Sequence, residues 1–136
     1  MSQRKILIVD DNALILKALS MKLTSKGYQV RTAQDGGEAS AAVRREKPDL
    51  ILLDVLFPAD VGHGGGVPWD GFLIINWLRR LEEGKKTPII VMSAAPAKDY
   101  ENKAIAAGAV AFLQKPLDHD QLVAIIDETL GYNHDE

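Results

Sequence analysis

The sequence predicts an α/β domain in which five short strands form a single doubly wound parallel sheet flanked by five helices. Apolar, strand-like segments alternate with helical patterns along the chain, and this alternation is typical of a βα-repeating sheet. The notable polar residues follow these strand segments directly, which is where ligands gather in a doubly wound sheet. At 136 residues the chain fits one domain, residues 1–136, with a core of its own.

The strands are expected at five short apolar segments. They lie at Ile6–Val9, roughly Gln29–Ala33, Leu50–Leu53, Ile89–Met92 and Ala109–Leu113. The first helix has leucines at helical spacing, namely Leu16, Leu19 and Leu23. Either Asp11 or Asn12 is expected to cap its N-terminus, and Gly27 lies where a C-terminal cap belongs.

A helix-breaking proline and a capping residue locate the second and last helices. The second is expected from about Asp35 to Glu46, because Pro48 cannot continue a helix. The last begins after Lys115-Pro116, with Asp118 as a cap. Its buried stripe is expected to consist of Leu122, Ile125, Ile126 and Leu130.

The composition is that of an ordinary globular protein and excludes several kinds of function. A formal net charge of −3 offers no general attraction to nucleic acid or to an anionic membrane. The chain has no cysteine, so it forms neither disulfides nor thiolate metal sites. Its apolar runs are too short for a signal peptide or a membrane span, so we expect a soluble, cytoplasmic protein.

Three carboxylates are expected at one edge of the sheet. Asp10 and Asp11 follow the first strand, and Asp54 ends the third. Two unit charges about 4 Å apart repel by about 4 kcal/mol at an effective dielectric near 20, so such a cluster needs a cation. A few carboxylates with water and phosphate oxygens describe a Mg2+ site, held by Asp11 and Asp54 directly and by Asp10 through water.

The same edge carries groups suited to phosphoryl transfer. Asp54 can attack phosphorus as a carboxylate nucleophile and form an acyl phosphate. Ser93, after the fourth strand, can donate a hydrogen bond to one phosphoryl oxygen, and the ammonium of Lys115, after the fifth strand, can meet another. Each of these residues alone has an ordinary structural use, but the combination favours chemistry.

Four segments of the chain together resemble the receiver domain of two-component response regulators. They are Val9-Asp10-Asp11-Asn12, the run from Leu53 to Pro58, Val91-Met92-Ser93-Ala94, and the run from Phe112 to Pro116. The resemblance extends over essentially the whole chain. It implies the flavodoxin-like strand order 2-1-3-4-5.

The resemblance also implies a role for each site residue. Asp54 would be the phosphoacceptor, and Mg2+ would be held by Asp10, Asp11, Asp54 and the backbone carbonyl of Leu56. Ser93 and Lys115 would bind the phosphoryl group, and the Lys115-Pro116 peptide bond would be cis.

The resemblance further implies a switch and its partners. Movement of Ser93 and rotation of Phe112 would change a surface made by the fourth helix, fifth strand and fifth helix, although Phe112 can also be read as a static core aromatic. The phosphoryl donor would be a histidine kinase or a histidine phosphotransfer protein, and the altered surface would bind a downstream protein. The domain would catalyse only its own phosphorylation and dephosphorylation, as a monomer or a weak, phosphorylation-dependent homodimer.

Two features depart from the common receiver pattern. Leu56 and Ala95 stand where related proteins often carry polar groups that orient the hydrolytic water, which predicts slow self-dephosphorylation. The loop at about 58–70 is longer than usual, because Gly71 comes seventeen residues after Asp54. This Gly-rich loop, with Asp60, His63 and Trp69, is a tolerated insertion, a partner contact, or a metal or nucleotide site.

Other functions fit the sequence less well than the switch. No P-loop motif is present, and Leu56 stands where a haloacid-dehalogenase phosphatase needs its second acid. The remaining alternative is a receiver-like interaction module that works without phosphorylation. The sequence leaves open how the switch passes on its signal. The chain would be a stand-alone receiver that contacts a target protein, a phosphorelay step that passes the phosphoryl group onward, or one domain of a longer regulator or hybrid kinase.

Overall fold

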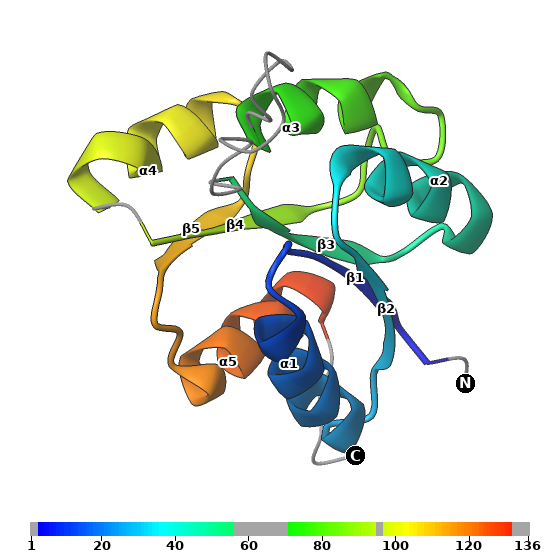
Figure 1. Ribbon diagram of the computed structural model, residues 1–136, viewed down its shortest axis with the longest axis vertical. Coiled ribbons are helices and arrows are strands. Elements are labelled where there is room, and N and C mark those ends of the chain that lie inside the picture. The colour runs from blue at the N-terminus through cyan, green and yellow to red at the C-terminus, as the bar shows by residue number, and fades with distance from the viewer. Residues whose placement is uncertain (1–2, 56–70, 95–96, 132–136) are drawn as a thin grey trace.

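The structure is a computed structural model that describes residues 3–55, 71–94 and 97–131 (Figure 1). Five strands and five helices alternate along these residues. The strands are β1 (Lys5–Val9), β2 (Gln29–Ala33), β3 (Leu50–Asp54), β4 (Ile89–Ser93) and β5 (Ala111–Gln114). The helices are α1 (Ala13–Ser25), α2 (Gly36–Glu46), α3 (Gly71–Arg80), α4 (Ala97–Ala106) and α5 (His119–Leu130).

All five strands are parallel and lie in the spatial order β2-β1-β3-β4-β5. The expected fold class and strand order are therefore confirmed. The register aligns the ends of the strands, because Val9 pairs with Leu53 and Ser93 pairs with Gln114. The chain thus leaves β1, β3, β4 and β5 at one common edge of the sheet, the edge at their carboxyl ends.

Helices cover both faces of the sheet, with α1 and α5 on one face and α2, α3 and α4 on the other (Figure 1). Successive side chains of β1 enter opposite layers, since strand residues alternate between the two faces. Leu7 and Val9 join the apolar cluster that includes residues of α2, α3 and α4, whereas Ile6 and Ile8 join the cluster formed with α1 and α5. Both faces of the central strands are therefore buried.

The capping residues fix where three helices begin. Asn12 is the N-cap of α1, Asp35 of α2 and Asp118 of α5, and each side chain accepts hydrogen bonds from backbone N–H groups of the first turn. Gly27, with φ of 96°, follows the C-cap of α1 and takes the left-handed conformation that glycine tolerates. The sequence predictions for these helix ends are confirmed, with Asn12 rather than Asp11 as the first cap.

Two details of the elements differ from expectation. The last strand spans Ala111–Gln114, because Ala109 completes the C-terminal turn of α4 by donating to Ala104. In α5 the buried residues are Leu122, Val123 and Ile126, whereas Ile125 and Leu130 are half-buried. All four residues of the expected stripe still pack in or against the apolar cluster on this face of the sheet, and Val123 joins them. Leu56, Ala95 and the loop at 58–70 lie outside the described residues.

Candidate phosphoryl and metal site

Three acidic side chains meet at the carboxyl edge of the sheet. Asp54 is the last residue of β3, and Asp10 and Asp11 follow β1 directly. One carboxylate oxygen from each of the three lies within 4.8 Å of the others. Two oxygens bound to one Mg2+ lie at most about 4.2 Å apart, because each stands roughly 2.1 Å from the ion. The three carboxylates are therefore close enough to one another for a single ion to contact more than one of them.

The acids differ in burial. Asp10 is 0% exposed and Asp54 is 3% exposed, whereas Asp11 lies at the surface. Partial desolvation, followed by the charge of Asp10, raises the pKa of Asp11 above its ordinary value. Both effects disfavour the charged form of the Asp11 carboxyl in the absence of a cation.

Lys115 supplies a positive charge to the two buried acids. Its Nζ donates to Asp10 Oδ2 at 2.6 Å and to Asp54 Oδ2 at 3.2 Å. Burial alone would lower the pKa of Lys115, but its hydrogen bond to Asp10 and the charges of Asp54 and Asp10 outweigh that effect and raise it. The side chain is therefore an ammonium ion at neutral pH.

Backbone contacts hold Lys115 and Asp10 in place. The backbone N–H of Lys115 donates to the carbonyl of Ser93 at 2.8 Å, which joins the ends of β4 and β5, and the Lys115-Pro116 peptide bond is cis. The backbone N–H of Asn12 donates to Asp10 Oδ1 at 2.9 Å. Asn12 thus orients Asp10 with its backbone N–H while its side chain caps α1, and only the capping role could be read from the sequence.

Ser93 and Phe112, the two residues expected to form the switch, lie on β4 and β5. Ser93 is the last residue of β4 and is 0% exposed. Phe112 is 9% exposed and pairs in register with Val91, two residues before Ser93. Phe112 belongs to the same apolar cluster as Ala104 of α4, so its side chain packs on the face of the sheet that α4 covers.

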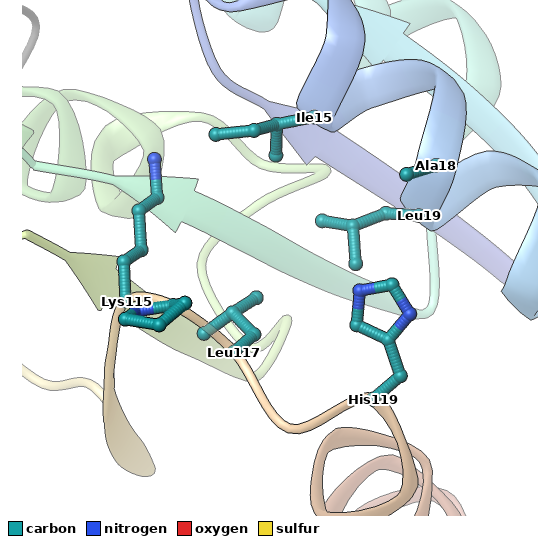
Figure 2. Close-up of a pocket in the computed structure, with 7 residues that line it drawn as sticks. Ile15, Ala18, Leu19, Lys115, Leu117 and His119 are labelled. Atoms are coloured by element: carbon teal, nitrogen blue, oxygen red, sulfur yellow. The ribbon is translucent and has the colours of Figure 1, made fainter.

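An apolar cavity of about 230 Å³ lies next to the site, between α1 and the segment that follows β5. Figure 2 shows Ile15, Ala18 and Leu19 of α1 facing Leu117 and His119, with the Lys115 side chain at the edge of the cavity. No local sequence pattern signals this cavity, because its walls come from two segments about a hundred residues apart in the chain.

The profile of the response regulator receiver domain matches residues 6–127. The chain belongs to this family. The response regulator PleD of Caulobacter vibrioides is 34% identical to it over 120 residues, which make up 88% of this chain and 24% of PleD. Protein PilH of Pseudomonas aeruginosa is 32% identical over 130 residues, 93% of this chain and 98% of PilH. This receiver domain therefore spans about a quarter of one relative and nearly all of the other.

A metal ion is present in the solved structure of a related receiver domain. The receiver domain of the sensor histidine kinase PA1611 from Pseudomonas aeruginosa PAO1 matches this receiver domain with a TM-score of 0.79 and 28% identity, over 96% of this chain and 99% of that domain. That structure has a magnesium ion coordinated in its active-site cleft. Receiver domains bind Mg2+ in an acidic pocket and act as signalling domains, and response regulators interact with histidine kinases and downstream effectors. Among the described residues, no helix is long and apolar enough to span a bilayer.

Proposed function

We propose that this receiver domain is a phosphoacceptor switch that takes a phosphoryl group onto Asp54 from a phosphohistidine donor. The observation that carries the proposal is the placement of a nearly buried Asp54 within hydrogen-bonding distance of Lys115 and beside two further acids. A carboxylate held this way is oriented for attack and has a cation ready for the negative charge that arrives with the phosphoryl group.

The transfer is a displacement at phosphorus. A carboxylate oxygen of Asp54 forms the new O–P bond, the P–N bond to the donor imidazole breaks, and its electron pair returns to the imidazole nitrogen. Lys115 and the Ser93 hydroxyl would bind the phosphoryl oxygens during the transfer. Lys115 already contacts Asp54, so its ammonium needs only a small movement to reach a group attached there.

Mg2+ would be held by Asp11, Asp54 and the backbone carbonyl of Leu56, and when bound it would neutralise charge on the phosphoryl oxygens. Each oxygen of Asp10 already accepts a hydrogen bond, Oδ1 from the Asn12 backbone and Oδ2 from Lys115. These contacts favour a role for Asp10 through a water molecule, with Asp11 and Asp54 as the direct carboxylate ligands. The surface position of Asp11 gives an ion access from solvent.

The phosphoryl group would change the surface of α4, β5 and α5. Ser93, at the end of β4, would move toward the phosphoryl group, and the space beside the Phe112 ring would change with it. Because Phe112 shares a cluster with Ala104, a change in its packing acts on α4. Phenylalanine has no hydroxyl, so this coupling works through packing alone.

The partners follow from the chemistry of the site. The donor is a histidine kinase or a histidine phosphotransfer protein, and the apolar cavity bordered by Lys115 offers it a contact beside the phosphoacceptor. The output is a protein contact on the α4-β5-α5 surface, a phosphorelay step, or the control of an attached domain. The alternative is an interaction module that works without phosphorylation, and the intact set of site residues favours the switch over it.

Intact mass spectrometry tests the proposal directly. After incubation with Mg2+ and acetyl phosphate, we expect the protein to gain the mass of one phosphoryl group. EDTA should prevent the gain, and hydroxylamine should remove the group, because hydroxylamine cleaves acyl phosphates and leaves phosphoserine intact. If neither acetyl phosphate nor a phosphorylated kinase adds mass, the interaction-module alternative replaces the switch.

The phosphorylated form is expected to be long-lived. Leu56 and Ala95 have no side-chain hydrogen-bonding groups with which to orient an attacking water molecule. The decay of the phosphorylated mass in Mg2+ buffer measures the lifetime, and Leu56→Asn should shorten it by adding a polar group. Leu56→Met is the matched control and should leave the lifetime unchanged. A short-lived phosphorylated form in the unaltered protein would contradict this prediction.

A further inference from the structure

Arg79 connects three segments of backbone on the α3 and α4 side of the sheet. It lies in the last turn of α3 and is half-buried. Its Nη1 donates to the carbonyls of Gly84 at 3.0 Å and Thr87 at 2.5 Å, both in the connection between α3 and β4. Its Nη2 donates to the carbonyl of Gly108 at 3.2 Å, just after α4. One side chain thus bridges the end of α3 to the end of α4.

The guanidinium of Arg79 is used for backbone contacts. In the part of the chain that the structure describes, no carboxylate forms an ion pair with it. Burial lowers the pKa of Arg79, but an arginine stays charged at neutral pH. A planar fork of N–H donors can reach three carbonyls at fixed angles, which a lysine ammonium on a flexible stem does less well.

The C-terminal end of α4 is also held by its own backbone. Gly108, with φ of +111°, takes the left-handed conformation of a helix C-terminus. The N–H groups of Gly108 and Ala109 donate to Ile105 and Ala104, and the N–H of Val110 donates to the carbonyl of Ile89 in β4. The segment 107–110 is therefore fixed to β4 by one hydrogen bond and to α3 through Arg79.

The two ends of α4 face different parts of the molecule. Its N-terminal residue, Ala97, follows soon after Ser93, which lies at the phosphoryl site. Its C-terminal end lies at the opposite edge of the sheet, beside the anchor made by Arg79. A displacement that begins at Ser93 therefore reaches α4 at one end while the other end is tied.

We propose that Arg79 is a positioning residue that anchors the C-terminal end of α4, so that phosphorylation turns α4 about this end and moves its N-terminal end. The proposal rests on the phosphoacceptor function and adds how the output surface responds to it. The anchor converts a local change at Ser93 into a rotation of α4, and keeps the α4 end at Ile105 in one place. Arg79 does not touch the phosphoryl site.

Hydrogen exchange of the full chain, with and without beryllofluoride as the phosphoryl mimic, tests the anchor. In the unaltered protein, beryllofluoride should change exchange at residues 97–100 and leave the amides of 107–110 protected. In Arg79→Gln, the amides of 107–110 should exchange at least about tenfold faster even without beryllofluoride, because the carbonyl of Gly108 loses its charged hydrogen-bond donor. Beryllofluoride should then affect both ends of α4.

Three variants separate the anchor from a general loss of stability. Arg80→Gln changes the exposed neighbour in the same helical turn and should behave like the unaltered protein. Arg79→Lys keeps the charge and should restore only part of the protection. Gly108→Ala strains the anchored turn from the other side and should also loosen 107–110, while all variants should still gain one phosphoryl mass from acetyl phosphate.

The possible outcomes distinguish the two proposals. If Arg79→Gln leaves 107–110 as protected as before, or if beryllofluoride loosens both ends equally in the unaltered protein, the anchor is wrong. If the unaltered protein never takes up a phosphoryl group, the phosphoacceptor function fails instead. The comparison of Arg79→Gln with Arg80→Gln without beryllofluoride still decides whether the anchor exists.

Discussion

Asp54→Asn is expected to abolish phosphorylation by acetyl phosphate and Mg2+. The amide that replaces the carboxylate lacks the anionic oxygen that attacks phosphorus, and it removes one carboxylate of the cluster. Intact mass should show one added phosphoryl group in the unaltered protein and none in the variant over the same time. A phosphorylated histidine kinase as donor should give the same contrast.

The matched control is Asp120→Asn, which changes a carboxylate on the exposed face of α5 whose side chain is 90% exposed. It should be phosphorylated like the unaltered protein. Asp54→Asn should also stay folded, since removing one of three clustered negative charges relieves repulsion when no metal is bound. A phosphoryl gain in Asp54→Asn that hydroxylamine removes would place the acceptor on another acid and overturn the assignment.

Lys115→Met is expected to slow phosphoryl transfer by about 10²- to 10³-fold, which is the usual effect of removing one preorganised donor from a transition state. Methionine has a similar length but no charge, so the phosphoryl oxygens lose their ammonium partner. The variant should also lose about 3 kcal/mol of unfolding free energy in metal-free buffer, because Asp10 and Asp54 keep their buried charges without a counterion.

Single-turnover phosphorylation in the presence of Mg2+, and urea unfolding with and without Mg2+, measure these two effects. Mg2+ should restore part of the stability of Lys115→Met by binding the folded acids, but it should not restore the rate. Lys17→Met changes an exposed lysine of α1 and is the control for both measurements. A Lys115→Met protein that transfers phosphate at the normal rate would show that the ammonium has only a structural role.

The sequence predicted the sheet and the place of the acids well, because both depend on local patterns. Buried strands in a parallel sheet must be apolar, and the chain must turn at their carboxyl ends, so Asp10 and Asp54 could be assigned to one edge before any distance was known. The caps Asn12 and Asp118 were found for the same reason, since a capping side chain bonds only to its own first turn.

Contacts between distant segments could not be predicted in this way. Lys115 was expected to meet a phosphoryl group, but the sequence did not show that it contacts Asp10 more closely than Asp54. Arg79 reads as an ordinary basic residue at the end of a helix, where a positive charge complements the helix dipole. Its bond to Gly108 depends on how α3 and α4 pack, and no local pattern encodes that distance.

The position of β1 between β2 and β3 has a consequence for how the chain folds. The strand nearest the N-terminus is an interior strand, and each of its parallel neighbours is separated from it by at least one helix. No two strands can pair through a tight hairpin, so every sheet contact closes a long loop, which slows folding relative to a helical bundle of the same length. The unit of β1, α1 and β2 can assemble first, but Asp10 acquires its acidic neighbour Asp54 only when β3 adds to the other side.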